Sequence, residues 1–331
     1  MSHALGNAVE WTPTRPEMAD EAFTLFAAAY RRARRRRPWV PELANDQEAR
    51  LRARVRRAFS FPGVVAWRNG RMVGYLIASP IFEVRGLPAT LIPEHAHAVA
   101  PGDERALYGP LYASAIEARV REGARLHLIG RFAGEAATGE ALEELGFGAI
   151  VAERLRDLAD VPDSSTTRAG PSVRIEAHSA SASWDDVAAI AAEHARYYAQ
   201  SPIFLRKEAS VEAAREDLEA HRQAGDRLFV ARIDDAIGAY LIVGPCAGET
   251  EGRLLAGTRT AQVRSAYARP ELRRHGIGSA LLQRAVRWAR DTGYERLFVE
   301  HETANLEGGA FWRRHFSPFL RVSMRYVERL P

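Results

Sequence analysis

Residues 263–289, VRSAYARPELRRHGIGSALLQRAVRWA, contain the stretch that decides the fold. An apolar strand leads into a turn with Pro270, then into a loop rich in arginine and glycine, and then into an amphipathic helix. Gly276 and Gly278 let the backbone turn tightly, so successive N–H groups converge with the N-terminus of that helix. The stretch therefore predicts a backbone cradle for a phosphate group.

Two common nucleotide-binding motifs do not fit this loop. A dinucleotide-binding turn would place its first glycine directly after the strand, and Gly or Ala at the sixth motif position, where Leu281 stands. A P-loop requires Gly-Lys-Ser or Gly-Lys-Thr, whereas Lys207 is the only lysine in the chain. The cradle must therefore be of another type.

The loop resembles motif A of the GNAT superfamily, a family of acyl-CoA-dependent N-acyltransferases. Residues 273–278, Arg-Arg-His-Gly-Ile-Gly, match its signature Gln/Arg-x-x-Gly-x-Gly/Ala at every fixed position. The resemblance extends to Pro270 and to Asn305 ahead of the segment GGAFW, and it covers most of residues 172–331. It implies the GNAT fold, in which the fourth and fifth strands splay apart and admit a pantetheine arm.

The resemblance also implies acetyl-CoA as co-substrate and direct transfer of the acyl group to an amine. Backbone amides from Arg274 to Ser279 would hold the pyrophosphate, the edge of the preceding strand would bind the pantetheine and the acyl carbonyl, and Asn305 would contact the pantetheine arm. The implied cofactor-binding residues are Ala266, Tyr267, Ala268, Arg273, Arg274, His275, Gly276, Ile277, Gly278, Ser279, Asn305 and Trp312.

Two departures from the family pattern concern the proton transfers. Trp312 stands where the family has a tyrosine that can protonate the leaving thiolate, and an indole N–H does not usefully release its proton. Water or Tyr267 is therefore expected to supply the proton that the leaving thiolate takes up. The segment between Val299 and Asn305 is also longer than in commoner members.

A base is needed because an alkylamine with a pKa of about 10.4 is charged at pH 7, and freeing its lone pair costs about 4.6 kcal/mol. Glu300 and Glu302 share one face of an extended strand, while Val299 and His301 share the other. Either glutamate is a candidate base, with His301 next, and the alternative is that both are solvated charges at a strand end.

The chain reads as two similar halves. Residues 159–171 are rich in Pro, Asp, Ser and Thr without an apolar period, which is typical of a linker. The hairpin VVAWRNGRMVGYLI at 64–77 is similar to LFVARIDDAIGAYL at 228–241. Each half has the order strand, helices, hairpin, strand, helix, strand, helix, strand, which predicts a mixed α/β sheet twice over. We expect tandem GNAT-like domains over 1–158 and 172–331.

The first half lacks a cradle. At the corresponding place it reads VAPGDERALYGPLYA, with Asp103 and Glu104, and carboxylates there would repel phosphate. We interpret residues 1–158 as a degenerate, structural domain and residues 172–331 as the catalytic one.

Composition limits the remaining possibilities. The 331 residues contain 47% hydrophobic residues and no apolar run of about 18, and the first residues lack a signal peptide, so we expect no membrane association. Cys246 is the only cysteine, which excludes a disulfide and suits the cytoplasm. The net charge of +4 does not demand nucleic acid. The arginine run at 31–37 is interpreted as the solvated end of a helix rather than as a nucleic-acid patch.

Several other polar and aromatic residues are explained by packing or by solvent exposure. His194 and His221 are interpreted as surface or hydrogen-bonded histidines of amphipathic helices, and His95 and His97 lack a third ligand, so no metal is expected. Residues 197–204, with two tyrosines and Pro-Ile-Phe, either line an acceptor pocket or belong to the core.

The sequence therefore predicts an N-acetyltransferase acting on a small-molecule or protein amine. The alternative is an acyl-CoA-binding pseudoenzyme or interaction scaffold without turnover, and nucleic-acid binding ranks below both. The acceptor, the acyl-chain preference and the oligomeric state are not readable from the residues.

Overall fold

The computed structural model describes residues 8–159, 173–178, 184–233, 236–248 and 252–328. The chain divides into two compact units, Met1–Glu153 with Pro318–Pro331, and Arg154–Ser317. Nearly all of the expected linker lies outside the described residues. The last strand of the chain belongs to the first unit, so these units differ from the predicted domains 1–158 and 172–331. The predicted domain boundaries stay a prediction.

The first unit follows the predicted order, with one added hairpin. Its elements are β1 (Glu10–Pro13), α1 (Ala19–Arg36), α2 (Asn45–Ala58), β2 (Gly63–Arg68), β3 (Arg71–Ile77), β4 (Phe82–Val84), β5 (Leu87–Ile92), β6 (His97–Val99), α3 (Glu104–Arg121), β7 (Leu126–Phe132), α4 (Ala136–Glu144), β8 (Gly148–Asp157), which ends in the second unit, and β14 (Ser317–Tyr326). Strands β1-β2-β3-β6 form one sheet, and β4-β5-β7-β14 are neighbours in another. The β4–β5 hairpin is the element that the sequence analysis missed.

The second unit follows the predicted order as far as its last helix, whereas the strand predicted to close it, β14, belongs to the first unit. Its elements are β9 (Val173–His178), α5 (Trp184–Tyr198), α6 (Val211–Gln223), β10 (Arg227–Ile233), β11 (Ala236–Pro245), β12 (Thr260–Ala268), α7 (Ile277–Asp291), β13 (Arg296–Glu302) and α8 (Leu306–His315). The strands lie in the order β13-β12-β11-β10-β9. The expected mixed α/β sheet is confirmed, because β12 and β13 are parallel and the other pairs are antiparallel.

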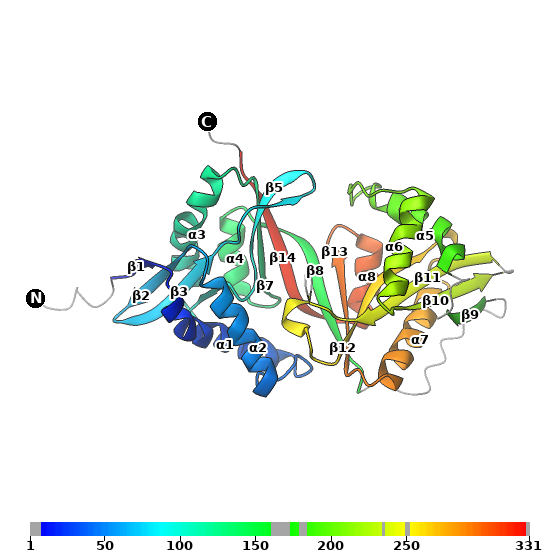
Figure 1. Cartoon of the computed structure of the whole chain (residues 1–331), viewed down its shortest axis with the longest axis horizontal. Coiled ribbons are helices and arrows are strands. Elements are labelled where there is room, and N and C mark those ends of the chain that lie inside the picture. The colour runs from blue at the N-terminus through cyan, green and yellow to red at the C-terminus, as the bar shows by residue number, and fades with distance from the viewer. Residues whose placement is uncertain (1–7, 160–172, 179–183, 234–235, 249–251, 329–331) are drawn as a thin grey trace, which may run out of the picture. The chain divides into compact units, whose positions relative to one another are not determined.

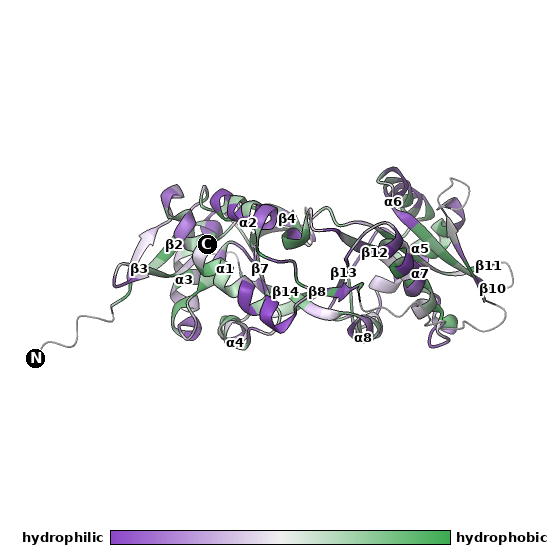
Figure 2. Cartoon of the chain, turned by 90° about the horizontal axis from the view of Figure 1, so that it is seen from below, coloured by the Kyte–Doolittle hydropathy of each residue, from purple (hydrophilic) through white to green (hydrophobic). Residues whose placement is uncertain are grey.

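Successive side chains of a strand point to opposite faces of the sheet. Because β10 and β11 are apolar at consecutive positions, both faces of the second unit's sheet are apolar. Phe229 and Leu241 pack in the core that includes α7, whereas Val230 and Ile242 pack against α5 and α6. Figure 1 shows α5 and α6 on one side of these strands and α7 on the other, and Figure 2 colours much of β10 and β11 as hydrophobic. Both faces of the sheet are therefore covered by helices.

Strands β12 and β13 are parallel neighbours over only part of their length. Their paired residues run from Thr260 opposite Arg296 to Val263 opposite Val299. Both strands continue beyond the last of these pairs. Their carboxyl halves, Arg264–Ala268 and Glu300–Glu302, form an opening that we call the fork.

A β-bulge lies where the fork begins. Along β11, the consecutive residues Ile242 and Val243 face Ser265 and Val263 of β12, so Arg264 is an extra residue. A bulge bends its strand and increases the local twist. The bulge at Arg264 therefore turns β12 away from β13 at their last paired position.

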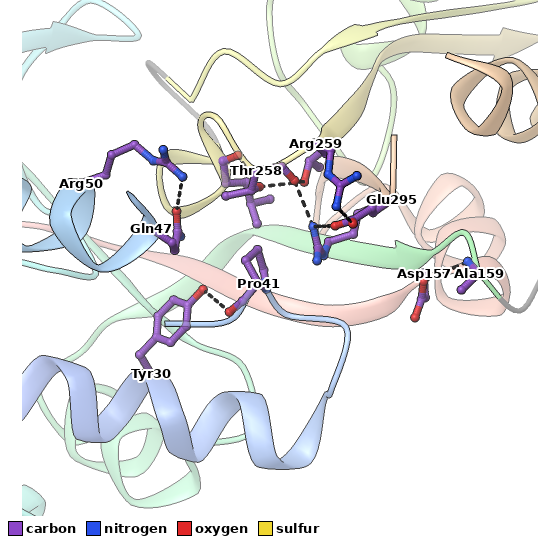
Figure 3. A network of polar contacts seen from close by, with 12 residues as sticks. Tyr30, Pro41, Gln47, Arg50, Asp157, Ala159, Thr258, Arg259 and Glu295 are labelled. Carbon is purple, nitrogen blue, oxygen red and sulfur yellow. Dashed lines mark hydrogen bonds and ion pairs between the residues drawn. The ribbon is translucent and has the colours of Figure 1, made fainter. Parts of the chain in front are cut away.

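Polar contacts fasten the closed end of the fork, just before both strands begin. The Glu295 amide donates to the Arg259 carbonyl at 2.8 Å, and the two side chains form an ion pair (Figure 3). Nη1 of Arg296 donates to the Thr258 carbonyl at 2.9 Å. Because these contacts hold the amino ends together, the strands separate only toward their carboxyl ends.

In the described part of the first unit, side chains fill most of the space at the corresponding place. Strands β6 and β7 lie in different sheets, and His97 bridges them. Its Nε2–H donates to the Gly130 carbonyl at 2.6 Å, and its Nδ1 accepts from the Tyr108 hydroxyl at 2.9 Å. The cavity beside it measures about 10 Å³, which is near the lower limit for one water molecule.

His97 makes the free energy of unfolding depend on pH. Burial lowers the pKa of His97 to about 4, whereas an unfolded histidine titrates near 6.5. Between these values the unfolded chain binds more protons, so stability is lost as the pH falls through this window. We expect wild type to lose about 2 kcal/mol through His97 between pH 7.5 and 5. Urea unfolding of wild type and His97→Gln at both pH values checks this, and an equal loss in both proteins would contradict it.

The arginine run at the end of α1 is partly engaged within the first unit. Arg32 pairs with Glu135 at 3.1 Å, Arg36 donates to the Gly134 carbonyl, and Nη1 of Arg37 donates to the Ala133 carbonyl at 2.8 Å. The run was expected to be a solvated helix end, and these three arginines instead fasten α1 to the β7–α4 loop.

None of the helices in the described ranges is long and apolar enough to cross a membrane.

Candidate functional site

A cavity of about 1060 Å³ lies in the second unit, and the fork forms part of its wall. Most residues that the sequence analysis assigned to the co-substrate line it: Ala266, Tyr267, Ala268, Arg273, Arg274, Gly276, Ile277, Gly278, Ser279, Asn305 and Trp312. Glu300 lines it too, whereas His275 and Glu302 are not among the lining residues. The structure therefore brings the cradle, the strand edge and one of the two glutamates to a single cavity.

The cradle is built by two left-handed residues before α7. Arg274 has φ +64°, and Gly276, the N-cap of α7, has φ +80°. These conformations turn the loop back onto the helix, and the first amides of a helix have no acceptor within it. The N–H groups of Ile277, Gly278 and Ser279 are in this position at the cavity wall. They suit an anion whose charge is also favoured by the helix dipole.

Arg273 connects the cradle to two neighbouring elements. Its Nε donates to the Ala268 carbonyl at 3.1 Å, and its guanidinium pairs with Glu307 of α8. The guanidinium also lies 4.8 Å from the ring centre of Tyr197 and 5.6 Å from that of Tyr267. Arg273 therefore fixes the loop beside the end of β12.

Asn305 caps α8 and faces the cavity. Its Oδ1 accepts from the Gly308 amide at 2.9 Å and from the Tyr197 hydroxyl at 3.1 Å. Because Asn305 Oδ1 already accepts two hydrogen bonds, a ligand that leaves both bonds intact would contact Asn305 through Nδ2. Trp312, 8% exposed, packs edge-on against Phe311 and belongs to the core beneath the cavity.

A polar and aromatic cluster lines the cavity on the α5 side. His194 Nδ1 lies 2.9 Å from the Tyr240 hydroxyl, which is 3.0 Å from Ser265 Oγ at the fork. The His194 ring stacks on Tyr267 at 5.0 Å between centres. Burial lowers the pKa of His194 to about 3, so its imidazole is neutral near pH 7. His194 is a hydrogen-bonded histidine, as expected, but the sequence did not place it in the cavity.

Two carboxylates and a lysine occupy the same side. Burial raises the pKa of Tyr198 to about 12, with a smaller contribution from the charges of Glu302 and Glu300. The same two carboxylates favour the charged form of Lys207. The Lys207 ammonium lies 3.7 Å from the ring centre of Tyr198. We call this part of the cavity wall the acceptor end: Tyr198, Lys207, Asp217 and Glu300, with Glu302 nearby.

His301, the reserve candidate for the base, is engaged at both ring nitrogens. Its Nδ1–H donates to the Glu302 carbonyl at 2.9 Å, and its Nε2 accepts from Arg154 Nε at 3.0 Å. Burial lowers the pKa of His301. It has no lone pair left for an acceptor amine without breaking the Arg154 bond.

His221 also lines the cavity, and its Nδ1 pairs with the buried carboxylate of Asp226 at 2.8 Å.

Of the aromatic and apolar residues in the segment 197–204, Tyr197 and Tyr198 line the cavity, whereas Ile203 is buried and Phe204 is 71% exposed. Only the two tyrosines are therefore placed where they could line an acceptor pocket. Among the described residues, no group of three or more His, Cys, Asp or Glu could hold a metal ion.

The fork, the cradle and the N-terminus of α7 all lie in one stretch of the second unit, between β12 and β13. Residues 189–316 match the family model described as "Acetyltransferase (GNAT) family". The second unit therefore carries a GNAT domain, and the resemblance noted in the sequence is confirmed.

Solved structures extend the likeness to the whole chain. A "Tandem GNAT protein from the clavulanic acid biosynthesis pathway" aligns with a TM-score of 0.53 and 16% identity over 98% of this chain and 99% of its own. A GCN5-related N-acetyltransferase from Sphaerobacter thermophilus aligns with a TM-score of 0.57 and 15% identity over 96% and 95%. Such identities show the fold alone, and the chain has a tandem GNAT fold. No curated protein matches it.

Proposed function

We propose that the second unit transfers an acyl group, with acetyl-CoA as donor, to an amine. The observation that carries the proposal is the fork, which forms part of the wall of a cavity of about 1060 Å³ that is also lined by the cradle and by carboxylate and tyrosine side chains. The same cavity therefore offers binding groups for a pyrophosphate, for an extended arm and for a reacting amine.

The open strand edge fits the pantetheine arm. On one side, β12 pairs with β11 up to Ala239 opposite Ala268, but its pairing with β13 ends at Val263. The Ala268 carbonyl already accepts from Arg273 Nε. The backbone groups of Ala266 on the fork side are proposed to bind an extended ligand, which would pair with them as an added strand does. The amides of the α7 N-terminus are available to the pyrophosphate in the same way.

The proposed chemistry needs a base on the amine and a proton for the thiolate. Glu300, exposed at the cavity, would accept the amine proton, directly or through water. Tyr267, partly buried beside Arg273, would donate to the thiolate. Trp312 would form an apolar wall beside the thioester without taking part in proton transfer.

The first unit is proposed to be structural. His97 and Tyr108 occupy the place between β6 and β7 where the second unit has its fork, and the cavity there is lined by Glu94 and Glu135 together with Arg32 and Arg131. Its volume of about 10 Å³ is too small for a pyrophosphate. We expect one CoA molecule per chain.

The proposal is tested by thiol release from acetyl-CoA in the presence of a panel of amines, from small amines to peptide amines. Thiol release that depends on the amine, with an acetylated amine as product, supports transfer. CoA binding by calorimetry without release for any amine would favour the scaffold alternative, and absent CoA binding would overturn the site itself.

Tyr267→Phe is expected to lower kcat by about 10²-fold while leaving CoA binding unchanged, because the phenol proton is lost and the ring is kept. Partial burial raises the pKa of Tyr267, so the phenol is protonated near neutral pH and can act as an acid. A pH–rate profile of both proteins checks this, with loss of the alkaline limb in the variant. An unchanged limb and turnover would remove Tyr267 from the mechanism.

A further inference from the structure

Lys207 lies in the segment between α5 and α6 and lines the same cavity as the cradle. The residue is exposed, and its ammonium is seated on the Tyr198 ring at 3.7 Å. Glu300, Glu302 and Asp217 act on it from β13 and α6. A primary amine of the protein itself therefore occupies the acceptor end.

The composition of the chain makes a lysine at this position informative. Of the 46 lysine and arginine residues, Lys207 is the only lysine. A guanidinium stacks on a tyrosine ring at least as readily as an ammonium does, so the contact with Tyr198 does not require lysine. What arginine cannot supply is a neutral amine, because its guanidinium does not lose its proton in proteins.

The surroundings of Lys207 favour the neutral amine more than water does. Desolvation of the ammonium by the surrounding cavity wall lowers the pKa of Lys207, although Glu302, Glu300 and Asp217 oppose this effect. The same carboxylates can accept the proton that the ammonium must lose. The acceptor end thus holds a nucleophile and a proton acceptor together.

We propose that Lys207 is itself an acceptor and is acylated at Nζ by the acyl-CoA bound in its own cavity. This inference rests on the proposed function. The neutral Nζ attacks the thioester carbonyl, the C–N bond forms, the C–S bond breaks, and the electron pair leaves with sulfur. The ammonium loses one proton before the attack and one after it; the thiolate takes one, and the other passes through a carboxylate to solvent.

Acylation would change the acceptor end in two ways. It removes the positive charge that faces Glu300 and Glu302, and it places an acyl group over the Tyr198 ring. An acceptor amine would then meet a filled site, so self-acylation limits transfer. The product is an amide, which is stable without a separate hydrolase.

The test is intact-mass analysis and peptide mapping of the full chain incubated with acetyl-CoA and no amine. We expect one added acetyl group, located at Lys207, at a rate independent of protein concentration because the reaction lies within one chain. Lys207→Arg keeps the charge and the ring contact, and it should bind CoA normally in calorimetry while gaining no acetyl group at this position.

Two controls separate self-acylation from chemical acetylation. Acetyl phosphate acetylates exposed amines without a CoA site, and the urea-unfolded chain presents the same lysine to acetyl-CoA. Modification of native Lys207 by acetyl-CoA should exceed the rate for the unfolded chain by at least about 10²-fold, and Gly278→Asp should abolish the excess. A native rate equal to the unfolded rate, or proportional to protein concentration, overturns the inference.

The failure of this inference is distinguishable from that of the proposed function. CoA binding and transfer to a free amine, with Lys207 unmodified, would overturn self-acylation alone. Absent CoA binding would overturn both.

Discussion

Gly278→Asp is expected to raise the Kd for CoA by about 10²-fold or more, because it places a carboxylate in the first turn of α7, where the cradle amides face an anionic ligand. Like charges brought together at a binding site cost several kcal/mol, and 10²-fold corresponds to about 2.7 kcal/mol. The substitution should leave the fold intact. A Cβ at Gly278 would lie 3.4 Å from the Phe311 ring, which is ordinary contact, and no positive φ is needed there.

Gly278→Ala is the matched control for this prediction. It adds the same Cβ without the charge, so its Kd should stay within about 10-fold of wild type. Calorimetry on the three proteins separates shape from charge and also gives the stoichiometry, expected as one CoA per chain. Equal affinity of the aspartate variant and wild type would contradict the cradle assignment, and two CoA per chain would contradict the structural role of the first unit.

The order of elements could be predicted because local patterns determine it. The hairpin around Gly238, the amphipathic α7 and the apolar β12 each carry a periodicity that tertiary contacts reinforce. The β4–β5 hairpin was missed because its strands are short, and the exposed Phe82 gives no clear alternation. The membership of β14 in the first unit could not be read either, because strand partners are set by distant residues: Leu320 pairs with Phe132.

The CoA end of the site was readable and the acceptor end was not. The cradle is one continuous segment, and its backbone conformation follows from Gly276 and the N-terminus of α7. The acceptor end instead joins α5, the segment after it and α6 to β13, which is far from them in the sequence. Alternation alone did not separate Glu300 from its neighbours, since Val299 and His301 line the cavity as well. The one usable signal for Lys207 was its rarity.

Glu300→Gln is expected to lower kcat/KM for a proven amine acceptor by about 10²–10⁴-fold, the usual contribution of a general base. An acceptor alkylamine with a pKa of about 10.4 is an ammonium at pH 7, and its lone pair must be freed before it can attack. The amide of glutamine preserves shape and hydrogen bonding but accepts no proton. CoA binding should be unchanged, because Glu300 lies on β13 and is not one of the cradle residues before α7.

Glu302→Gln makes the same chemical change two residues along β13 and is the matched comparison. Glu300 is exposed and lines the cavity, whereas Glu302 is only partly exposed and is not among the lining residues, so the loss in Glu302→Gln should be smaller. Steady-state kinetics over about pH 6 to 9 checks both variants, and the acid limb of the kcat/KM profile should disappear only where the base is removed. If both variants work at the wild-type rate throughout, the base lies elsewhere. His221 is then the next choice, since its Nδ1 is held by Asp226 and its ring lines the cavity.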